Sequence, residues 1–364
     1  MASKLAGVGS SCVGGGRKRV LSIQSHVVSG YVGNKAAVFP LQLLGFDVDI
    51  INSVQFSNHT GYPFGWEGEV LDGSKLEKLI DGMERNGLLS SSTTDGPINS
   101  DGRIGNILTG YIGSESFLKA VVKVVQKLKR LNPKCRYICD PVLGDMGRFY
   151  VPKELVDIYR RDVLPLADVI TPNQFEVEQL TGITIRTIHD AQRACRFLHD
   201  VGVNLVLITS IVFSDDVVES AGECLKSRDP GMTKDRVTPP PNDSIAMFTS
   251  RRKCRLNKMS QIIPNVQDDG NTDAFIDEQY IVYTPRLAGQ FTGTGDVCAA
   301  LFLGLTSDSY HDANTLEDST SLACSLEKLA GTYVLFVAHE TSTNCLTRCV
   351  CSSKLQFRYD ACDS

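Results

Sequence analysis

Short apolar runs alternate with helix-like segments along most of this sequence, and this alternation restricts the fold more than any other feature. In the clearest segment, which Ser114 opens, apolar residues recur at helical spacing, and Lys127, Lys129 and Arg130 lie at its end. Strands that alternate with helices build a mostly parallel sheet with helices on both faces, so we expect an α/β fold of this kind. The predicted strands are 20–24, 48–54, 106–109, 137–143, 168–171, 205–210 and 281–284, and the predicted helices are 33–44, 114–130, 153–161, 174–180, 189–200, 297–305 and 322–337.

The composition argues against several kinds of partner. Of the 364 residues 42% are hydrophobic, enough for a sizeable core, and the net charge of -5 argues against nucleic acid or an anionic membrane. No run of about 18 apolar residues predicts a membrane-spanning helix. The N-terminal segment lacks the apolar stretch of a secretory signal, and the 12 cysteines show no C-x-x-C spacing. We therefore expect a cytoplasmic protein with reduced thiols.

The pattern predicts one domain over residues 19–340, between a mobile N-terminal tail (1–18) and a C-terminal tail (341–364) of unassigned role. Two polar stretches, 90–105 and 214–278, interrupt the alternation and are interpreted as inserted loops. Inside the second, only Ile245–Thr249 has the character of a strand. A basic cluster follows it and is either a binding patch or, as we favour, a solvated loop end; it consists of Arg251, Arg252, Lys253 and Arg255.

The sharpest chemical signal is the run Gly293-Thr294-Gly295-Asp296, which precedes an apolar helix-like segment. A glycine-rich turn that enters a helix aims several N–H groups at one point, where the helix dipole favours an anion. The carboxylate of Asp296 suits such a site if it takes a proton from an attacking hydroxyl while the N–H groups hold phosphate charge. The alternative is that Thr294 or Asp296 simply caps the helix. The run is not a Walker A loop, and no G-x-G-x-x-G follows the first strand.

Two acidic motifs follow predicted strands. Asp140 and Asp145 lie five residues apart on a turn shaped by proline and glycine, which suits Mg2+ held partly through water; an acidic surface turn is the alternative. Asn173 followed by Glu176 is a capping-box pattern that starts a helix. Glu176 can also face the metal and phosphates, and the two roles are compatible.

Polar residues also follow strands near the front of the chain. Ser25 and His26 come after the first predicted strand, His59 and Thr60 after the second, and Tyr111 after the third. Because folds of this class bind ligands at the carboxyl edge of the sheet, these residues are candidates for a binding pocket. For a lone histidine such as His26 or His59, a hydrogen-bonded structural role is the favoured interpretation.

These motifs occur in one order, and together they resemble the pyridoxal kinases, a family with the ribokinase-like fold. The resemblance covers most of residues 19–212 and resumes near 280–340. It implies a homodimer that transfers phosphate from ATP to the 5′-hydroxyl of pyridoxal, pyridoxine or pyridoxamine, with Mg2+ and a monovalent cation, K+ or Na+. The motifs that carry it are Ser22–Val27, Asn52–Tyr62, Leu108–Tyr111, Cys139–Asp145, Ile170–Glu176 and Gly293–Asp296.

The resemblance also implies a role for individual residues. Asp296 would be the general base, and the N–H groups of Gly293, Thr294 and Gly295 would form an anion hole. The substrate would be held by Asp296 and by Ser25, Val32, His59, Thr60, Tyr111 and Thr292. The nucleotide would contact Asp140, Asn173, Glu176, Thr209, Ser210, Phe291 and Thr294, and the cations would be held by Asp140, Asp145, Thr171 and Glu176.

Part of the sequence departs from the family pattern, and other functions are possible for a chain with these motifs. The stretch Met146–Tyr150 after Asp145 is shorter than in animal relatives, so the resemblance implies an altered flap over ATP and an altered nucleotide affinity. A hydroxymethylpyrimidine kinase of the same superfamily would share the glycine turn. Ser25 and the run Asn58–Tyr62 favour a kinase that acts on pyridoxal. A non-catalytic relative that binds vitamin B6 or a protein is disfavoured by the intact acidic residues. A nicotinamide dehydrogenase lacks support because the early glycine fingerprint is missing.

Overall fold

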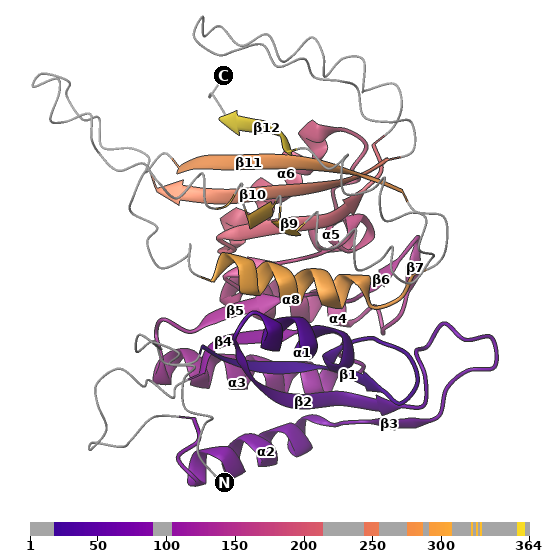
Figure 1. Cartoon of the computed structure of the whole chain (residues 1–364), viewed down its shortest axis with the longest axis vertical. Helices are drawn as coiled ribbons and strands as arrows, with labels where there is room; N and C mark the ends of the chain where they lie inside the picture. Colours follow the sequence, from indigo (N-terminus) through magenta and orange to yellow (C-terminus); the bar gives the residue numbers. More distant parts are fainter. Residues whose placement is uncertain are drawn as a thin grey trace, which may run out of the picture.

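A ten-stranded sheet runs through the computed structural model, which describes residues 18–89, 104–213, 244–254, 275–286, 291–307, 322, 325, 326, 328, 329 and 355–360. The strand order is β12-β11-β10-β9-β8-β5-β4-β1-β2-β3 (Figure 1). All neighbours from β9 to β2 pair in parallel, whereas β10, β11, β12 and β3 join antiparallel. The strands are β1 (Arg19–Val27), β2 (Asp47–Phe56), β3 (Gly68–Val70), β4 (Ile104–Thr109), β5 (Arg136–Cys139), β8 (Val169–Ile170), β9 (Leu205–Ile211), β10 (Ser244–Cys254), β11 (Phe275–Pro285) and β12 (Leu355–Asp360).

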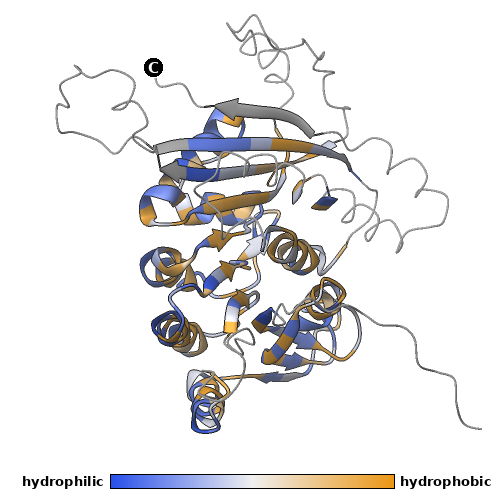
Figure 2. Cartoon of the chain, turned by 60° about the vertical axis from the view of Figure 1, so that its left-hand side comes forward, coloured by the Kyte–Doolittle hydropathy of each residue, from blue (hydrophilic) through white to orange (hydrophobic). Residues whose placement is uncertain are grey.

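Helices cover both faces of the sheet, as the sequence predicts (Figure 2). One face carries α2 (Gly73–Arg85), α3 (Glu115–Leu131), α4 (Leu155–Ile158), α5 (Gln174–Thr181) and α6 (Ile188–Val201), which share one apolar core. The other face carries α1 (Asn34–Leu43) and α8 (Thr294–Thr306), which share a second core. Because α8 is buried over almost its whole length, it is apolar on nearly all sides.

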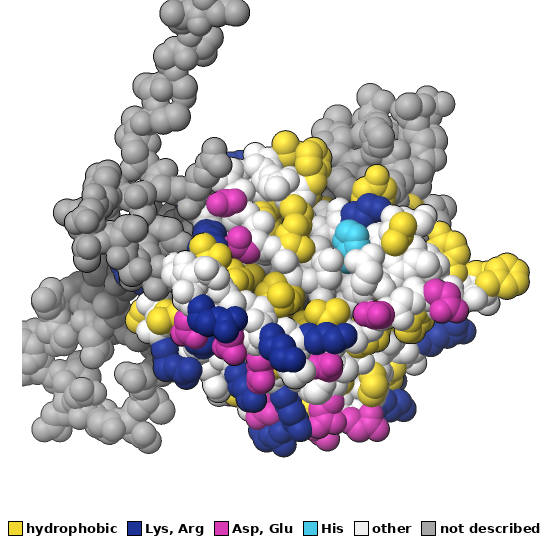
Figure 3. Space-filling model, turned by 90° about the horizontal axis from the view of Figure 1, so that it is seen from below, with side chains coloured by type: hydrophobic (Ala, Val, Ile, Leu, Met, Phe, Trp, Pro, Cys, Tyr) yellow, Lys and Arg dark blue, Asp and Glu magenta, His cyan; other side chains and the backbone are white. Residues whose placement is uncertain are grey.

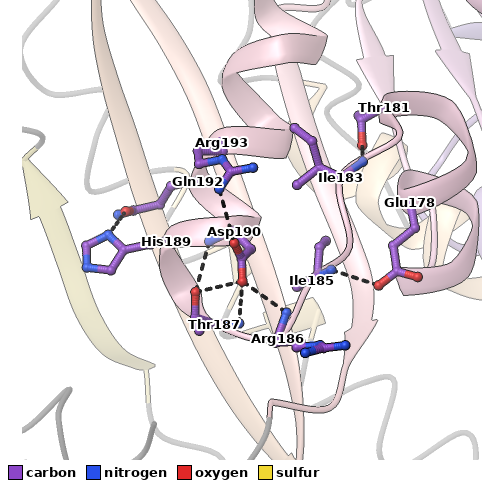
Figure 4. A network of polar contacts seen from close by, with 10 residues as sticks. All are labelled: Glu178, Thr181, Ile183, Ile185, Arg186, Thr187, His189, Asp190, Gln192 and Arg193. Atoms are coloured by element: carbon purple, nitrogen blue, oxygen red, sulfur yellow. Dashed lines mark hydrogen bonds and ion pairs between the residues drawn. The ribbon is translucent and has the colours of Figure 1, made fainter.

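Side-chain caps explain where several helices begin. Ser114 accepts a hydrogen bond from Phe117 N at the start of α3, as its sequence pattern predicts. The connection from α5 to α6 is tied down in the same way (Figure 4). There Asp190 accepts from the backbone of Thr187 in a capping box, and Glu178 accepts from Ile185 N. These bonds fix the connection between the end of α5 and the start of α6.

Several elements differ from their predictions. β5 ends at Cys139 rather than 143, because Pro141 has no N–H to continue the ladder. The chain then forms a small hairpin of β6 (Gly144–Asp145) and β7 (Arg148–Phe149), at the right of Figure 1. The predicted helix 153–161 forms only α4 before it widens into a π-helical turn at Tyr159–Val163. β3 and α2 were not predicted.

Both interpretations of the basic cluster are wrong for Arg251 and Arg252. Arg251 and Arg252 lie within β10, which runs well past the predicted strand. Arg251 pairs with Glu278 at 2.6 Å, and Arg252 pairs with Asp200 at 2.9 Å. The two arginines are therefore neither a loop end nor a free basic patch. The predicted insertion 214–278 contains β10 and the start of β11; its remainder, including Arg255, lies outside the described residues.

Other predictions fall partly or wholly outside the described residues. They are the tail 1–18 except Lys18, most of the loop 90–105 and most of the helix 322–337. The loop ends by 103 at the latest, because β4 begins at Ile104. β12 comes from the stretch predicted as a C-terminal tail and pairs with β11. Among the described helices, none has both the length and the apolar character needed to cross a bilayer.

The surface beneath the β3 edge mixes both signs of charge. Figure 3 shows lysine and arginine side chains interleaved with acidic ones across this face. Two ion pairs there join α3 to α2: Lys123 to Glu77 at 2.7 Å, and Lys127 to Glu84. Such exposed pairs contribute little stability, about 0–1 kcal/mol each. The mixture of signs gives this face no single-sign field of the kind that attracts nucleic acid.

Candidate active site

The candidate residues come from loops at one edge of the sheet. Because neighbouring strands from β2 to β9 run parallel, their carboxyl ends lie at the same edge, where such folds bind ligands. Asp140 follows β5 and Thr171 follows β8. The start of α8 reaches the same edge, since a Cβ on Gly295 would lie 3.7 Å from Asp140 Oδ2. The glycine turn and the first acidic motif are therefore neighbours.

The glycine turn has a shape that only glycine allows. Gly293 is the N-cap of α8 with φ 81°, and a Cβ there would lie 2.0 Å from the carbonyl oxygen of Tyr31. No side chain caps this helix, so the alternative that Thr294 or Asp296 acts as a simple cap is wrong. The first N–H groups of α8 thus remain for a ligand, with the helix dipole behind them.

Asp296 lies in the first turn of α8 and is buried. Its Oδ2 accepts a hydrogen bond of 2.8 Å from Gly33 N, immediately before α1. Burial raises the pKa of Asp296 to about 6, and the Gly33 bond opposes that rise. A carboxylate with one oxygen held and a pKa near neutrality suits proton abstraction. The sequence did not predict Gly33 as its partner, and the only signal was the paired glycines at 30 and 33.

Three buried carboxylates act on one another at this edge. Burial and the charges of Glu176 and Asp296 raise the pKa of Asp140 well above its usual value. Burial also raises the pKa of Glu176 to about 8. Carboxylates gathered in this way favour a cation that compensates their charge. The cluster therefore has the electrostatic character expected of a cation site.

Glu176 has a demonstrated structural role. Its Oε2 accepts from Asn173 N at 2.9 Å and its Oε1 accepts from Leu143 N at 3.0 Å, while Asn173 Oδ1 accepts from Glu176 N. The predicted capping box is confirmed, and it also fastens the loop after β5 to α5. Both carboxylate oxygens accept backbone bonds, and each oxygen keeps a further acceptor site that can meet a cation or a water.

The donor set fits a cation held largely through water and phosphate oxygens. Thr171 Oγ1 is buried and has no partner at full hydrogen-bond geometry among the described residues, but the hydroxyl lies near enough to Asp140 to lower the pKa of that carboxyl, against the rise caused by burial. Among the described residues, no three His, Cys, Asp or Glu side chains converge as direct ligands. Mg2+ commonly keeps several waters and binds one or two carboxylates plus substrate phosphates. The residues present are compatible with that mode.

Asp145 lies on the short hairpin. Its Oδ1 accepts from Met146 N at 2.8 Å, and Met146 and Gly147 both have positive φ, 47° and 76°. A two-residue turn with both φ values positive matches the twist of a tight hairpin. The hairpin contacts α5 through Phe149, whose ring meets Phe175 edge-on at 5.1 Å. The short stretch after Asp145 thus forms an ordered turn beside the acidic cluster.

Some of the predicted substrate residues lie beside the glycine turn or beside Gly33, since a Cβ on Gly293 would lie 3.3 Å from Val32 Cα. Ser25 is buried, and its carbonyl lies so close to Gly33 that a Cβ there would approach it to 2.1 Å. Val32 belongs to a small apolar cluster that Tyr111 contacts. The Tyr111 hydroxyl donates to Tyr150 O at 3.4 Å, which joins this side to the chain after β7.

His59 and Thr60 lie farther out on the loop after β2. His59 Nδ1 accepts from Gly61 N at 3.2 Å, and its ring packs on Tyr62. Burial lowers the pKa of His59, so the neutral imidazole is favoured. The hydrogen-bonded structural role predicted for a lone histidine is therefore present, while Thr60 is exposed.

The predicted nucleotide residues are partly engaged with one another. Asn173 Nδ2 donates to Gly144 O at 2.8 Å, so both ends of its amide hold backbone. Thr209 N donates to Pro172 O at 2.9 Å, which brings the end of β9 beside the turn before α5. Ser210 and Phe291 are half-buried and Thr292 is exposed. No described contact joins these last three to the acidic cluster.

Comparison with known proteins identifies the family. A family model described as phosphomethylpyrimidine kinase matches residues 97–233. Pyridoxal kinase from Arabidopsis thaliana is 43% identical over 307 residues, which cover 84% of this chain and 79% of that protein. Pyridoxal kinase from Bos taurus is 52% identical over 53% of this chain and 58% of its own length. The solved structure of pyridoxal kinase from Leishmania donovani with ADP and pyridoxamine aligns with a TM-score of 0.66 and 29% identity, covering 94% of this chain and 99% of that one. The fold is therefore the ribokinase-like α/β fold that the sequence predicted, and the chain belongs to the pyridoxal kinase family.

Proposed function

We propose that this protein transfers the γ-phosphoryl group of ATP to the 5′-hydroxyl of pyridoxal, pyridoxine or pyridoxamine. The observation that carries the proposal is Asp296, a buried carboxylate held by Gly33 N–H in the first turn of a helix whose N-terminal N–H groups have no side-chain cap. Support comes from Leishmania donovani pyridoxal kinase, whose structures contain ADP with pyridoxamine or with pyridoxine.

The proposed mechanism divides the work between side chain and backbone. Gly33 N–H orients Asp296 through Oδ2, and the other carboxylate oxygen accepts the proton of the 5′-hydroxyl as it attacks phosphorus. The N–H groups of Gly293, Thr294 and Gly295 bind the charge that develops on the transferred phosphoryl group. Ser25, Val32, His59, Thr60, Tyr111 and Thr292 hold the vitamin, and Asn173, Thr209, Ser210 and Phe291 hold the nucleotide.

We propose that Mg2+ and a monovalent cation, K+ or Na+, complete the site. When bound, they neutralise phosphate charge. The residues that would hold them, directly or through water, are Asp140, Asp145, Thr171 and Glu176. The proposal rests on the mutual charge of the buried carboxylates and on the buried hydroxyl of Thr171.

Replacing Glu176 by Gln tests that role. We expect the Mg2+ concentration needed for half-maximal turnover to rise by about tenfold or more, with a parallel rise in KM for ATP, because a group that orients a metal site is lost. The measurement is a Mg2+ titration at several ATP concentrations. Glu178→Gln is the control, since Glu178 lies on the same helix and also accepts from a backbone N–H. An unchanged metal requirement in Glu176→Gln would leave Glu176 with its capping role alone.

The pH dependence tests the base. Asp296 acts only as the carboxylate, and its pKa is raised to about 6 by burial. Turnover is therefore expected to be full well above that pH and to fall as the pH drops through it, because the proton then occupies the base. The measurement is kcat/KM for pyridoxal from pH 5 to 8. The residual activity of Asp296→Asn should not fall in this way at low pH. If the same fall persists in the variant, it arises from the titration of another group.

Substrate identity is decided by one assay. ADP release is measured with ATP, Mg2+ and K+, with either pyridoxal or hydroxymethylpyrimidine as acceptor. Pyridoxal-dependent turnover that forms pyridoxal 5′-phosphate is the expected result. Hydroxymethylpyrimidine remains the second candidate substrate because of the matching family model. Turnover with the pyrimidine alone would assign the protein as a hydroxymethylpyrimidine kinase. Binding of pyridoxal without turnover would indicate a non-catalytic relative.

We also propose a homodimer in the cytoplasm. The dimer is supported by large apolar side chains exposed on and beside α1, namely Phe39, Leu43 and Ile50. Sedimentation of the purified protein should give twice the chain mass, and a monomer at micromolar concentration would exclude the dimer. The cytoplasmic assignment rests on the expectation of reduced thiols; Cys135, Cys139, Cys195 and Cys298 are free thiols in the structure.

A further inference from the structure

The start of α1 contains a buried network of side-chain hydrogen bonds that the proposed chemistry does not use. Asn34, the first residue of α1, is 2% exposed. Its Nδ2 lies within bonding distance of Ile51 O (2.9 Å), Asn52 Oδ1 (2.9 Å) and Gln24 O (3.3 Å). Its Oδ1 accepts from Ser22 Oγ at 2.7 Å. One amide thus ties the first turn of α1 to both β1 and β2.

The directions of these bonds are mutually consistent. Gln24 Nε2 donates to Ser22 Oγ at 2.9 Å, so the Ser22 hydroxyl is free to donate its own proton onward to Asn34. Ser22 and Gln24 are both fully buried. Burying so many polar groups is costly unless each is paired, and here Gln24 Oε1 has no partner among the described residues. Apart from that one acceptor the network is paired, and a buried network of this kind rigidifies the backbone that it joins.

The residue before Asn34 is the one that holds the base. Gly33 N donates to Asp296 Oδ2, and this is the only hydrogen bond to that carboxyl from the described residues. Gly33 is the N-cap of α1 without a side-chain cap, with φ 54° and ψ -132°. Its position against Ser25 leaves no room for a Cβ. The orientation of the Gly33 N–H therefore depends on what fixes the chain on either side of it.

We infer that Asn34 is a positioning residue for the phosphoryl transfer: by locking the first turn of α1 to β1 and β2, it aims the Gly33 N–H at Asp296 and so sets the angle of the base toward the hydroxyl. The inference rests on the proposed role of Asp296. Displacement of a reacting group by about 1 Å can cost about a hundredfold in rate. A residue that positions the base through Gly33 should therefore have a measurable effect on the rate.

The test is a double-mutant cycle on kcat. Asn34→Ala is expected to lower kcat by about tenfold to a hundredfold while the KM for ATP stays within about twofold. If Asn34 acts through Asp296, adding Asn34→Ala to Asp296→Ala should cost less than about twofold more, because there is no base left to position. Asn52→Ala removes one partner of the network and should give a smaller fall in kcat, again without a change in the KM for ATP. This second variant tests the inference if Asn34→Ala does not fold.

Asn132→Ala is the matched control. Asn132 Nδ2 also ties a helix end to a strand, donating to Ile104 O at 3.0 Å, but at the amino end of β4. This variant should keep the parent kcat even where its melting temperature falls as far as that of Asn34→Ala. The inference would be overturned if the fold-losses in kcat of the two single variants multiplied in the double variant. It would also be overturned if Asn34→Ala lowered kcat no more than Asn132→Ala does. Full turnover in Asp296→Ala alone would instead overturn the role of Asp296.

Discussion

Asp296→Ala is expected to lower kcat by about a hundredfold or more with little change in the affinity for pyridoxal, because a general base is lost while the binding contacts remain. The geometry adds a finer prediction for Asp296→Asn. An amide oxygen can still accept from Gly33 N, which the native Oδ2 meets at 2.8 Å, so the fold of the turn should be retained. The rate should nevertheless fall as far as in the alanine variant, since an amide takes no proton.

The measurements are steady-state kcat and pyridoxal affinity by titration. Thermal unfolding of both variants shows whether a loss reflects chemistry or misfolding. If Asp296→Asn kept the parent kcat, Asp296 could not be the base, and its bond to Gly33 would be a structural link between α8 and α1. A loss in the alanine variant alone would point to the same conclusion.

Gly293→Ala is the second large effect. The new Cβ would lie 2.0 Å from Tyr31 O, and the residue would have to keep φ 81°, so the turn must move. The N–H groups of the anion hole then leave their aligned positions. Loss of a single donor of this kind typically costs about a hundredfold to a thousandfold in kcat, and we expect a fall in that range.

Gly45→Ala is the control for the backbone effect. Gly45 has φ 86°, similar to Gly293, but a Cβ there would meet nothing within 4 Å. This variant should lose about 1–2 kcal/mol of stability from the strained φ and keep its kcat. Both variants carry the strain of a positive φ, but only Gly293→Ala displaces the anion hole. Comparing the kcat and the melting temperature of the two variants therefore separates these two effects. Equal kcat values in both would remove the glycine turn from the chemistry.

Much of the fold and part of the site follow from local sequence. Helical periodicity located α3 and α6, and the spacing of Asn173 and Glu176 correctly predicted the capping box that starts α5. These features depend on interactions between residues three or four positions apart, which can be recognised without knowledge of distant partners. The glycine turn before Asp296 could also be predicted from the sequence, because only glycine occupies its backbone conformation without strain.

Elements toward the two ends of the strand order were harder to predict. β10 carries Arg251 and Arg252, whose charges give it the character of a loop until their partners on β11 and α6 are known. α2 and β3 were missed although α2 has an apolar stripe that packs on α3. β12 pairs with β11 from a stretch more than 60 residues further along the chain. For β10 and β12 the partners are distant in sequence, so no local pattern indicates the pairing, whereas the apolar stripe of α2 was a local signal that the sequence analysis missed.

The sequence by itself determined the α/β alternation, the glycine turn at the start of α8 and the capping box of α5, because each depends on backbone conformation or short-range bonds. Only the tertiary structure decided what surrounds them. It brought Gly33 to Asp296 across 263 positions, set Asp140 beside the glycine turn, and buried Asn34 between β1 and β2. The physical reason is that pKa values and the aim of a base depend on burial and on neighbours, and folding alone determines which residues become neighbours.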